Sequence, residues 1–222
     1  MKRLFNAMRK SSLLLGFYAL IGVLFVATAN LITKDQIAEN QRLQLQKKWN
    51  QVLDVSRYSN DLNVDNKIIA ANEIGLPKDA TVYLAKSKQG KPVAAIFRAT
   101  TLQGYGGAIT LLVAVDYNDQ HLTGVRVVEH TETPGLGDKI EVAKSDWILG
   151  FKGKSLSNPD KESWAVKRDG GDFDQFTGAT ITPRAIVGLV EDVLIYANKN
   201  MKSLFSDPIK SKTPRKKSEE TK

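Results

Sequence analysis

Three threonines stand close together ahead of an apolar helical pattern: Thr177, Thr180 and Thr182. Thr182 followed by Pro183 is typical of a helix start, because a hydroxyl can cap the helix and proline suits its first position. Gly178 lets the backbone pass close to a ligand. Free amides and the positive end of the helix dipole would suit a phosphate there. The same residues also fit an ordinary capped helix with a polar turn, which is the commoner arrangement.

The second candidate segment is Glu132–Gly137, with the sequence Glu-Thr-Pro-Gly-Leu-Gly. Two glycines around Leu136 give a backbone that can lie against a flat ligand, and the leucine offers an apolar contact. The amides near Gly135 and Gly137 could donate to carbonyl oxygens of that ligand. The plain alternative is a tight turn between a strand and a helix, with Asp138 as the helix cap.

Other residues that could suggest chemistry are assigned none. His130 and Glu132 could do acid–base work, but nothing pairs them with a nucleophile. Trp147 and Trp164 are more typical of a hydrophobic core than of a cofactor contact. The glycine cluster at 104–107 indicates a turn before a buried strand.

The spacing of apolar residues along the chain predicts the helices and strands that must position these segments. Apolar residues that recur at roughly helical spacing among polar ones predict a helix over 35–58. No element is predicted for the polar stretch 60–78. Strands are predicted at 81–85 and 93–99 as a hairpin, at 108–116 as a strand buried on both faces, and at 122–129 as its partner. Helices are predicted over 139–151 and 183–200, with a loop-rich stretch between them. Strands paired in hairpins beside helices predict an α+β fold with an antiparallel sheet and flanking helices.

The segment 11–33 carries no charged residue and would reach about 34 Å as a helix, enough for a bilayer core of roughly 30 Å. All four charges before it are positive, which predicts a cytoplasmic N-terminus and an exported domain, periplasmic in a Gram-negative cell. A cleaved signal peptide is the alternative, since Ala27-Thr28-Ala29 fits the cleavage pattern. The length of the apolar run favours an anchor that is kept.

The net charge of +8 over 222 residues is concentrated at the two ends. Residues 1–10 carry +4 and residues 206–222 carry +3, which leaves +1 for the remainder. A basic stripe on the fold is therefore disfavoured, and with it nucleic-acid binding. The absence of cysteine excludes disulfides, cysteine-ligated clusters and thiol catalysis, and two histidines disfavour a transition-metal site. We expect a basic cytoplasmic end (1–10), an anchor (11–33), a folded domain (34–205) and a disordered basic tail (206–222).

Thr177-Gly-Ala-Thr180 resembles the Ser/Thr-Gly-Ala-Thr flavinylation motif of the FMN-binding domain family. In that family a flavin transferase joins FMN through its phosphate to the hydroxyl of the last threonine, which implies a phosphoester at Thr180. Glu132–Gly137 resembles the other hallmark of the family. Four residues alone would be a weak signal, but the two motifs about forty residues apart are specific.

The resemblance is closest to the G subunits of the Rnf/Rsx ion-translocating electron-transport complexes and extends over nearly the whole chain. The C subunits of sodium-pumping quinone reductases share both motifs and are the nearest alternative. The compact chain and the continuation Gly-Asp-Lys-Ile after Leu136 favour the G subunits.

The resemblance implies a covalent FMN whose phosphate end is lined by Thr177, Gly178, Ala179 and Thr182. It places the isoalloxazine ring toward Glu132, Thr133, Pro134, Gly135, Leu136 and Gly137. The implied function is electron transfer in an inner-membrane complex that couples ferredoxin and NAD to movement of Na⁺ or H⁺, with no catalytic or metal residues of its own. The implied partners are other membrane subunits, the flavin transferase and membrane lipid. A docking module without flavin and a free-standing flavin reductase remain as alternatives, although no nicotinamide-binding motif supports the latter.

Overall fold

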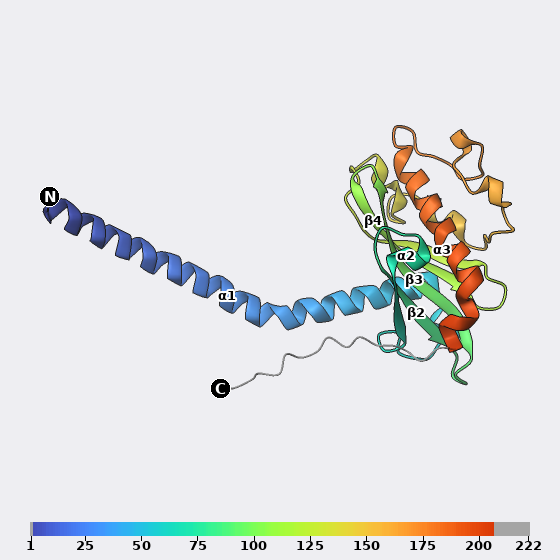
Figure 1. Cartoon of the computed structure of the whole chain (residues 1–222), viewed down its shortest axis with the longest axis horizontal. Helices are drawn as coiled ribbons and strands as arrows, with labels where there is room; N and C mark the ends of the chain where they lie inside the picture. Colours follow the sequence, from blue (N-terminus) through green and yellow to red (C-terminus); the bar gives the residue numbers. More distant parts are fainter. Residues whose placement is uncertain (1, 207–222) are drawn as a thin grey trace. The chain divides into compact units, whose positions relative to one another are not determined.

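The computed structural model describes the backbone of residues 2–206, with side chains from Ser12 onward except those of residues 35, 38, 41 and 42. Five antiparallel strands form one sheet whose spatial order equals their order in the chain (Figure 1). The strands are β1 (Asn66–Ile69), β2 (Ala80–Lys86), β3 (Pro92–Gly104), β4 (Gly107–Asp116) and β5 (Leu122–His130). The predicted hairpin, the buried strand and its partner are confirmed, as is the α+β class.

Burial of the central strand follows directly from its composition. Every residue of β4 from Ile109 to Asp116 is buried, as expected for an apolar run covered on both faces. The long helix α3 (Ile181–Ser206) lies across one face of the sheet (Figure 1). Its apolar stripe packs on the sheet, and Tyr196 meets the ring of Phe97 edge-on at 6.2 Å between centroids. This layer of sheet and helix is the main core.

The opposite face of the sheet is partly covered by the residues at the end of α1 (Lys2–Val52). The indole of Trp49 lies 4.8 Å from the ring of Tyr83 between centroids. Gly124 of β5 packs directly on the backbone of Val52, where a Cβ atom would lie 2.9 Å from the Val52 Cα. Glycine is needed there because two backbones approach more closely than any side chain permits.

The chain divides into two compact units at Gln46 and Lys47. In the first unit, Ser12–Lys34 is a helix with a mean hydropathy of 2.2, long and apolar enough to cross a membrane. The helix predicted over 35–58 is not a separate element, because α1 is continuous to Val52 and is followed by a 3₁₀ turn, Val55–Arg57. Asp54 caps this turn, since its carboxylate accepts from the Ser56 amide at 2.8 Å.

The helix predicted over 139–151 is wrong. Two 3₁₀ turns, η2 (Gly137–Ile140) and η3 (Trp147–Phe151), stand there instead. Ile140, Ile148 and Phe151 are buried at helical spacing, but extended backbone at Glu141 interrupts the helix. The unassigned stretch 60–78 holds β1 and a short helix, α2 (Ala71–Ile74). The predicted basic tail lies outside the described residues from 207 onward.

The contact between Gly124 and Val52 gives a test of the packing. Gly124→Ala should lower the free energy of unfolding by about 1–3 kcal/mol, because its methyl group would overlap backbone that cannot move away cheaply. Gly188→Ala in α3 is the matched control, since no atom lies within 4 Å of its added Cβ. That change should stabilise by about 0.5–1 kcal/mol through helix propensity. Denaturant unfolding of the full chain in detergent measures both, and equal effects would contradict this packing.

Candidate functional site

A buried carboxylate, Glu132, joins three separate segments of the domain. It lies two residues beyond the end of β5 and is only 5% exposed. Its Oε2 accepts a hydrogen bond of 2.6 Å from the hydroxyl of Thr182, in the first turn of α3. Its Oε1 accepts a bond of 3.0 Å from the amide of Gly106, in the turn between β3 and β4. One side chain therefore fixes the relative positions of a hairpin turn, a loop and a helix end.

Three glycines make room for this carboxylate and its loop. A Cβ at Gly104 would lie 2.6 Å from Glu132 Oε1, and one at Gly137 would lie 2.5 Å from Oε2. A Cβ at Gly106 would lie 2.1 Å from the carbonyl oxygen of Thr131. The glycine cluster at 104–107, predicted only as a turn, thus also serves the site through close approach.

The loop Glu132–Gly137 is held by bonds within itself. The amides of Leu136 and Gly137 both donate to the carbonyl of Thr133 at 3.1 Å. The amide of Gly135 donates to the Asp138 carboxylate at 2.8 Å, with Gly135 in the left-handed region at φ 80°. The amides predicted to meet a ligand are therefore used inside the loop. Asp138 stabilises this turn rather than capping an α-helix.

The two motifs meet around a pocket of about 540 Å³. A Cβ at Gly178 would lie 3.6 Å from Leu136 Cδ2, so the segments touch directly. Eight of the expected residues line the pocket: Glu132, Thr133, Leu136, Gly137, Gly178, Ala179, Thr180 and Thr182. Thr177, Pro134 and Gly135 are not among the lining residues. Three further residues line it that the sequence did not single out, Tyr105, Arg168 and Ile181.

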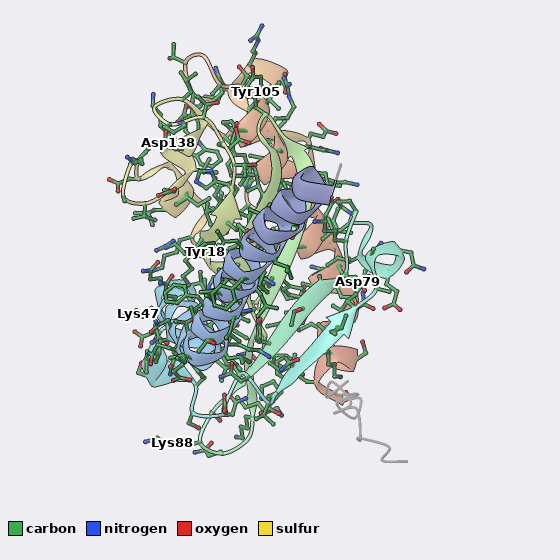
Figure 2. All side chains as sticks on the ribbon, turned by 90° about the vertical axis from the view of Figure 1, so that its left-hand side faces the viewer. Tyr18, Lys47, Asp79, Lys88, Tyr105 and Asp138 are labelled. Carbon is green, nitrogen blue, oxygen red and sulfur yellow. The ribbon has the colours of Figure 1, made fainter. Side chains whose placement is uncertain are left out.

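The pocket lies at one end of the sheet. Tyr105, in the β3–β4 turn, and Asp138 are at the opposite end of the domain from Lys88 in the β2–β3 turn (Figure 2). Tyr105 is 71% exposed, and Leu136 and Ile181 are each a little under half exposed. These three side chains come from three different segments and contribute apolar surface to the pocket lining.

The three threonine hydroxyls have different surroundings. Thr177 is exposed and Thr182 is completely buried, with its hydroxyl donated to Glu132. Thr180 is half-buried in the pocket wall, and its hydroxyl has no hydrogen-bond partner among the described residues. Of the three, Thr180 alone combines access to the pocket with a hydroxyl that is not already engaged.

The helix α3 begins earlier than its sequence predicts. Its first residue is Ile181, so Thr180 stands at the N-cap position and the predicted cap, Thr182, lies inside the first turn. Thr182 does not cap because Glu132 takes its hydroxyl. Pro183 is tolerated within the first turn, where its missing N–H has no intrahelical acceptor to lose. The amides of Ile181 and Thr182 likewise have no acceptor among the described residues.

Among the described residues that line the pocket, Arg168 is the only cation and Glu132 the only carboxylate. Arg168 belongs to a 3₁₀ turn, η5 (Lys167–Asp169), that is tied to α3. The guanidinium of Arg184 donates twice to Asp169, from Nε at 2.6 Å and from a terminal nitrogen at 2.8 Å. These bonds hold the pKa of Asp169 below its ordinary value. No sequence motif marks Arg168, because its place depends on this tertiary pairing.

Both predicted core tryptophans support the segment before Thr177. Trp147 donates from its indole nitrogen to the carbonyl of Asp174 at 2.8 Å and packs on Phe176 at 5.1 Å between centroids. Trp164 is buried and lies 5.0 Å from the ring of Phe173. Neither lines the pocket. Their role in the fold is to fix the stretch that leads into the threonine motif.

His130 also supports the loop rather than facing the pocket. Its Nε2 lies 2.6 Å from the carboxylate of Glu141, and its Nδ1 accepts from the Glu132 amide at 3.1 Å. Both ring nitrogens are therefore occupied.

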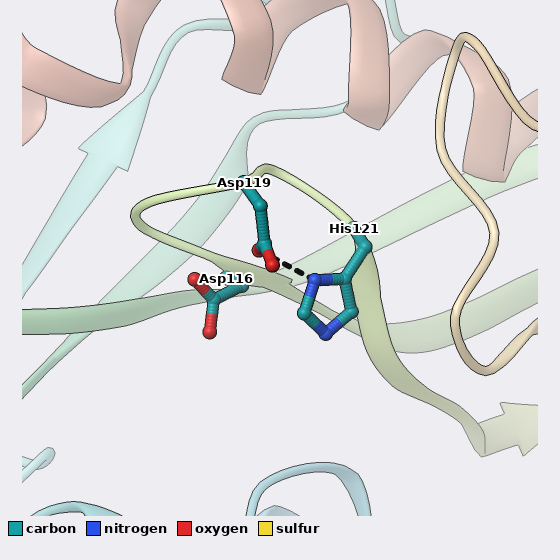
Figure 3. Close-up of side chains that lie close together, drawn as sticks. All are labelled: Asp116, Asp119 and His121. Carbon is teal, nitrogen blue, oxygen red and sulfur yellow. Dashed lines mark hydrogen bonds and ion pairs between the residues drawn. The ribbon is translucent and has the colours of Figure 1, made fainter.

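A second cluster of polar side chains lies in the β4–β5 turn, where Asp116, Asp119 and His121 converge (Figure 3). Their ligand atoms lie within 4.8 Å of one another. Burial raises the pKa of Asp116, but the hydrogen bonds from Arg57, the Asn118 amide and Asp119, together with the charge of Arg57, leave the pKa below its ordinary value. Because Arg57 already balances this charge, we assign the cluster to the stability of the turn.

Comparison with known proteins agrees with this geometry. The sequence model of the FMN-binding domain matches residues 104–195, and that of the RnfG N-terminal region matches residues 1–52. The G subunit of the ion-translocating oxidoreductase complex of Escherichia coli K12 is 49% identical over 86% of this chain and 92% of its own. The corresponding protein of Vibrio atlanticus is 41% identical over 92% of this chain and 97% of its own.

Two solved structures are also similar. Shewanella oneidensis NqrC is 26% identical with a TM-score of 0.46, covering 66% of this chain and 75% of its own. The C subunit of the Na⁺-translocating NADH-quinone reductase of Parabacteroides distasonis is 20% identical with a TM-score of 0.48, covering 77% and 96%. The sequence relatives carry the assignment: this chain belongs to the family of G subunits of ion-translocating oxidoreductase complexes.

Proposed function

We propose that this protein transfers electrons through an FMN joined by its phosphate to the Thr180 hydroxyl. One observation carries the proposal. Thr180 offers an unengaged hydroxyl on the wall of the pocket, at the first position before a long helix. The match of residues 104–195 to the FMN-binding domain supports the choice of cofactor.

The surroundings of Thr180 suit a phosphodiester. The helix end contributes a partial positive charge, and the amides of Ile181 and Thr182 are available as donors. Arg168 brings a full positive charge to the same pocket. Both oxygens of Glu132 already accept hydrogen bonds from other segments of the domain, so this carboxylate is held in place within the same pocket. We therefore assign the phosphate end to Thr180 with Gly178, Ala179 and Thr182, and with Thr177 beside them.

The remaining pocket suits a flat, partly apolar ring. Its volume lies within the range of about 300–1,000 Å³ that small-molecule sites occupy. Leu136 and Tyr105 offer apolar surface, while Thr133 and Gly137 line the polar side. Pro134 and Gly135 shape the loop behind them. When bound, the flavin supplies the redox chemistry, and this chain supplies position, charge balance and protection from loss of the cofactor.

The proposal extends to the place of the protein in the cell. We infer that 1–10 is cytoplasmic, that 11–33 is a single span of the inner membrane and that the folded domain is periplasmic. Electrons would then pass through the flavin while the whole complex links ferredoxin and NAD to movement of Na⁺ or H⁺. The span carries no charged residue from Ser11 to Thr33, so we assign ion passage to other subunits.

The covalent link is tested by mass spectrometry of the full chain made together with its flavin transferase. Wild type and Thr180→Ser, which keeps a hydroxyl, should carry one FMN-sized adduct. Thr180→Ala should carry none, because the nucleophilic oxygen is gone. An unmodified wild type, or an adduct that survives Thr180→Ala, would sink the proposal.

The role of Glu132 is tested through stability and flavin loading together. Glu132→Ala leaves the Thr182 hydroxyl and the Gly106 amide without an acceptor, which should cost about 2–4 kcal/mol of unfolding free energy. Flavin loading should also fall, because Glu132 would no longer join the β3–β4 turn and the first turn of α3 beside the pocket. Glu129→Ala, three residues earlier near the end of β5 and exposed, is the matched control and should change stability by less than about 0.5 kcal/mol. Equal effects of the two changes would contradict the role of Glu132.

The proposed orientation is tested by cysteine labelling, for which a cysteine-free chain is a clean background. Lys88→Cys, in an exposed turn of the domain, should react with a membrane-impermeant maleimide in cells whose outer membrane is permeabilised. Asn6→Cys, before the span, should react only after the inner membrane is disrupted. The reverse pattern would overturn the proposed topology.

A further inference from the structure

A row of side chains on the sheet face opposite α3 places two arginines near one another. The pairing register aligns Thr81 with Arg98, Arg98 with Leu112, and Leu112 with Arg126. Directly paired residues of antiparallel strands point to the same face, so Arg98 and Arg126 flank Leu112. With strands about 4.8 Å apart, their Cα atoms are separated by about 10 Å. Two like charges therefore share one small area of the face.

The neighbouring row on this face is covered, whereas the arginine row is not fully covered. This neighbouring row consists of the paired residues Tyr83, Ile96, Ala114 and Gly124. Trp49 packs on Tyr83 at one end of it, and Val52 packs on Gly124 at the other. Arg98 and Arg126 are only half-buried. Ile68, paired with Thr81 at the end of the arginine row, is 59% exposed. Leu102 lies four residues after Arg98 in β3 and therefore on the same face of the sheet. Its side chain is 50% exposed.

The two guanidinium groups have few acceptors within the part of the chain that the structure describes, and neither is paired with a carboxylate there. Arg126 donates once, to the carbonyl of Val125 at 2.7 Å, and its Nε is buried without a partner. Arg98 has neither a hydrogen bond nor a carboxylate within ion-pair distance there. Two other cations of the domain are paired, Lys86 with Asp65 and Arg184 with Asp169. The N–H groups of Arg98, which is only half-buried, therefore have no acceptor among the described residues.

The nearby carboxylates do not fill this role. Glu141 is engaged by His130, and no ion pair joins Glu129 to either arginine among the described residues. A third cation, Lys48, adds to the positive charge of the area, and its ammonium is bound to the carbonyls of Val127 and Val128 at 3.0 and 2.7 Å. Burial lowers the pKa of Lys48. The negative charge of Glu141 acts to raise this pKa, whereas the positive charge of Arg98 lowers it further.

We propose that this cationic face, defined by Arg98 and Arg126 with Ile68 and Leu102 at its edges, docks an acidic segment of another protein of the complex. Guanidinium groups pair with carboxylates through two parallel hydrogen bonds, which suits recognition of aspartate or glutamate side chains. The exposed apolar side chains at the edges favour a protein surface over a free anion. The family assignment supplies the setting, because relatives of this chain are subunits of a multi-subunit complex. The inference is independent of the flavin.

The test uses the assembled complex captured from solubilised membranes by a tag on another of its proteins. The retained amount of this chain is measured by immunoblot while the salt concentration of the wash is raised. Arg98→Glu should be released at about half the salt concentration that releases wild type, or less, because attraction becomes repulsion. Arg98→Lys keeps the charge and should stay close to wild type.

The matched control is Lys88→Glu, which makes the same change in net charge in an exposed turn at the far end of the sheet from the pocket. It should be retained like wild type. Unchanged thermal unfolding and an unchanged covalent flavin band would show that Arg98→Glu has folded. Retention of Arg98→Glu equal to that of Lys88→Glu would overturn the proposal.

The same experiment separates a protein partner from a lipid surface. The wash series is repeated after exchange into zwitterionic lipid. A difference between wild type and Arg98→Glu that persists supports an acidic protein segment. A difference that vanishes there and returns with anionic lipid would assign the face to phospholipid headgroups, and would overturn the proposed partner.

Discussion

The carboxylate of Glu132 is a charge held in the interior of the domain, and the pocket is built around the two donors that make this possible. An unpaired charge at 5% exposure would cost several kcal/mol, so the Thr182 hydroxyl and the Gly106 amide cannot be lost without a penalty. The donors belong to α3 and to the β3–β4 turn, which are far apart in the chain. The hydrogen bonds that Glu132 accepts therefore fix the position of the N-terminal end of α3 relative to the sheet.

This constraint also explains the hydroxyl proposed as reactive. A threonine at an N-cap normally accepts from an amide of the first helical turn. Here the third residue of α3 is Pro183, which has no N–H, and Thr180 makes no capping bond with the remaining amides. Thr182, the other candidate cap, is turned inward by Glu132. The sequence Thr-Ile-Thr-Pro thus leaves a hydroxyl and two amides together at the same helix end.

The strands could be predicted from the sequence, because burial of β4 on both faces leaves a continuous apolar run. The turns η2 and η3 could not, since Ile140 and Ile148 keep a helical spacing although the chain leaves the helix at Glu141 and then forms a turn, and short-range patterns do not distinguish the two cases. Both motifs of the site were visible as glycine and threonine spacing. The bond between Glu132 and Thr182 spans fifty residues and leaves no local signal, and the same holds for Arg168, which a tertiary ion pair places.

The sheet is a simple meander in which each strand pairs only with its neighbours in the chain, and all five strands precede α3. Such pairing is local and needs no later residue to begin. The pocket, by contrast, is complete only when the last helix docks and Thr182 reaches Glu132. With the proposed topology, the sheet would emerge first from the export machinery and Thr180 would emerge after it. A flavin on Thr180 would therefore mark chains that have finished folding, and maturation of the cofactor would double as quality control of the fold.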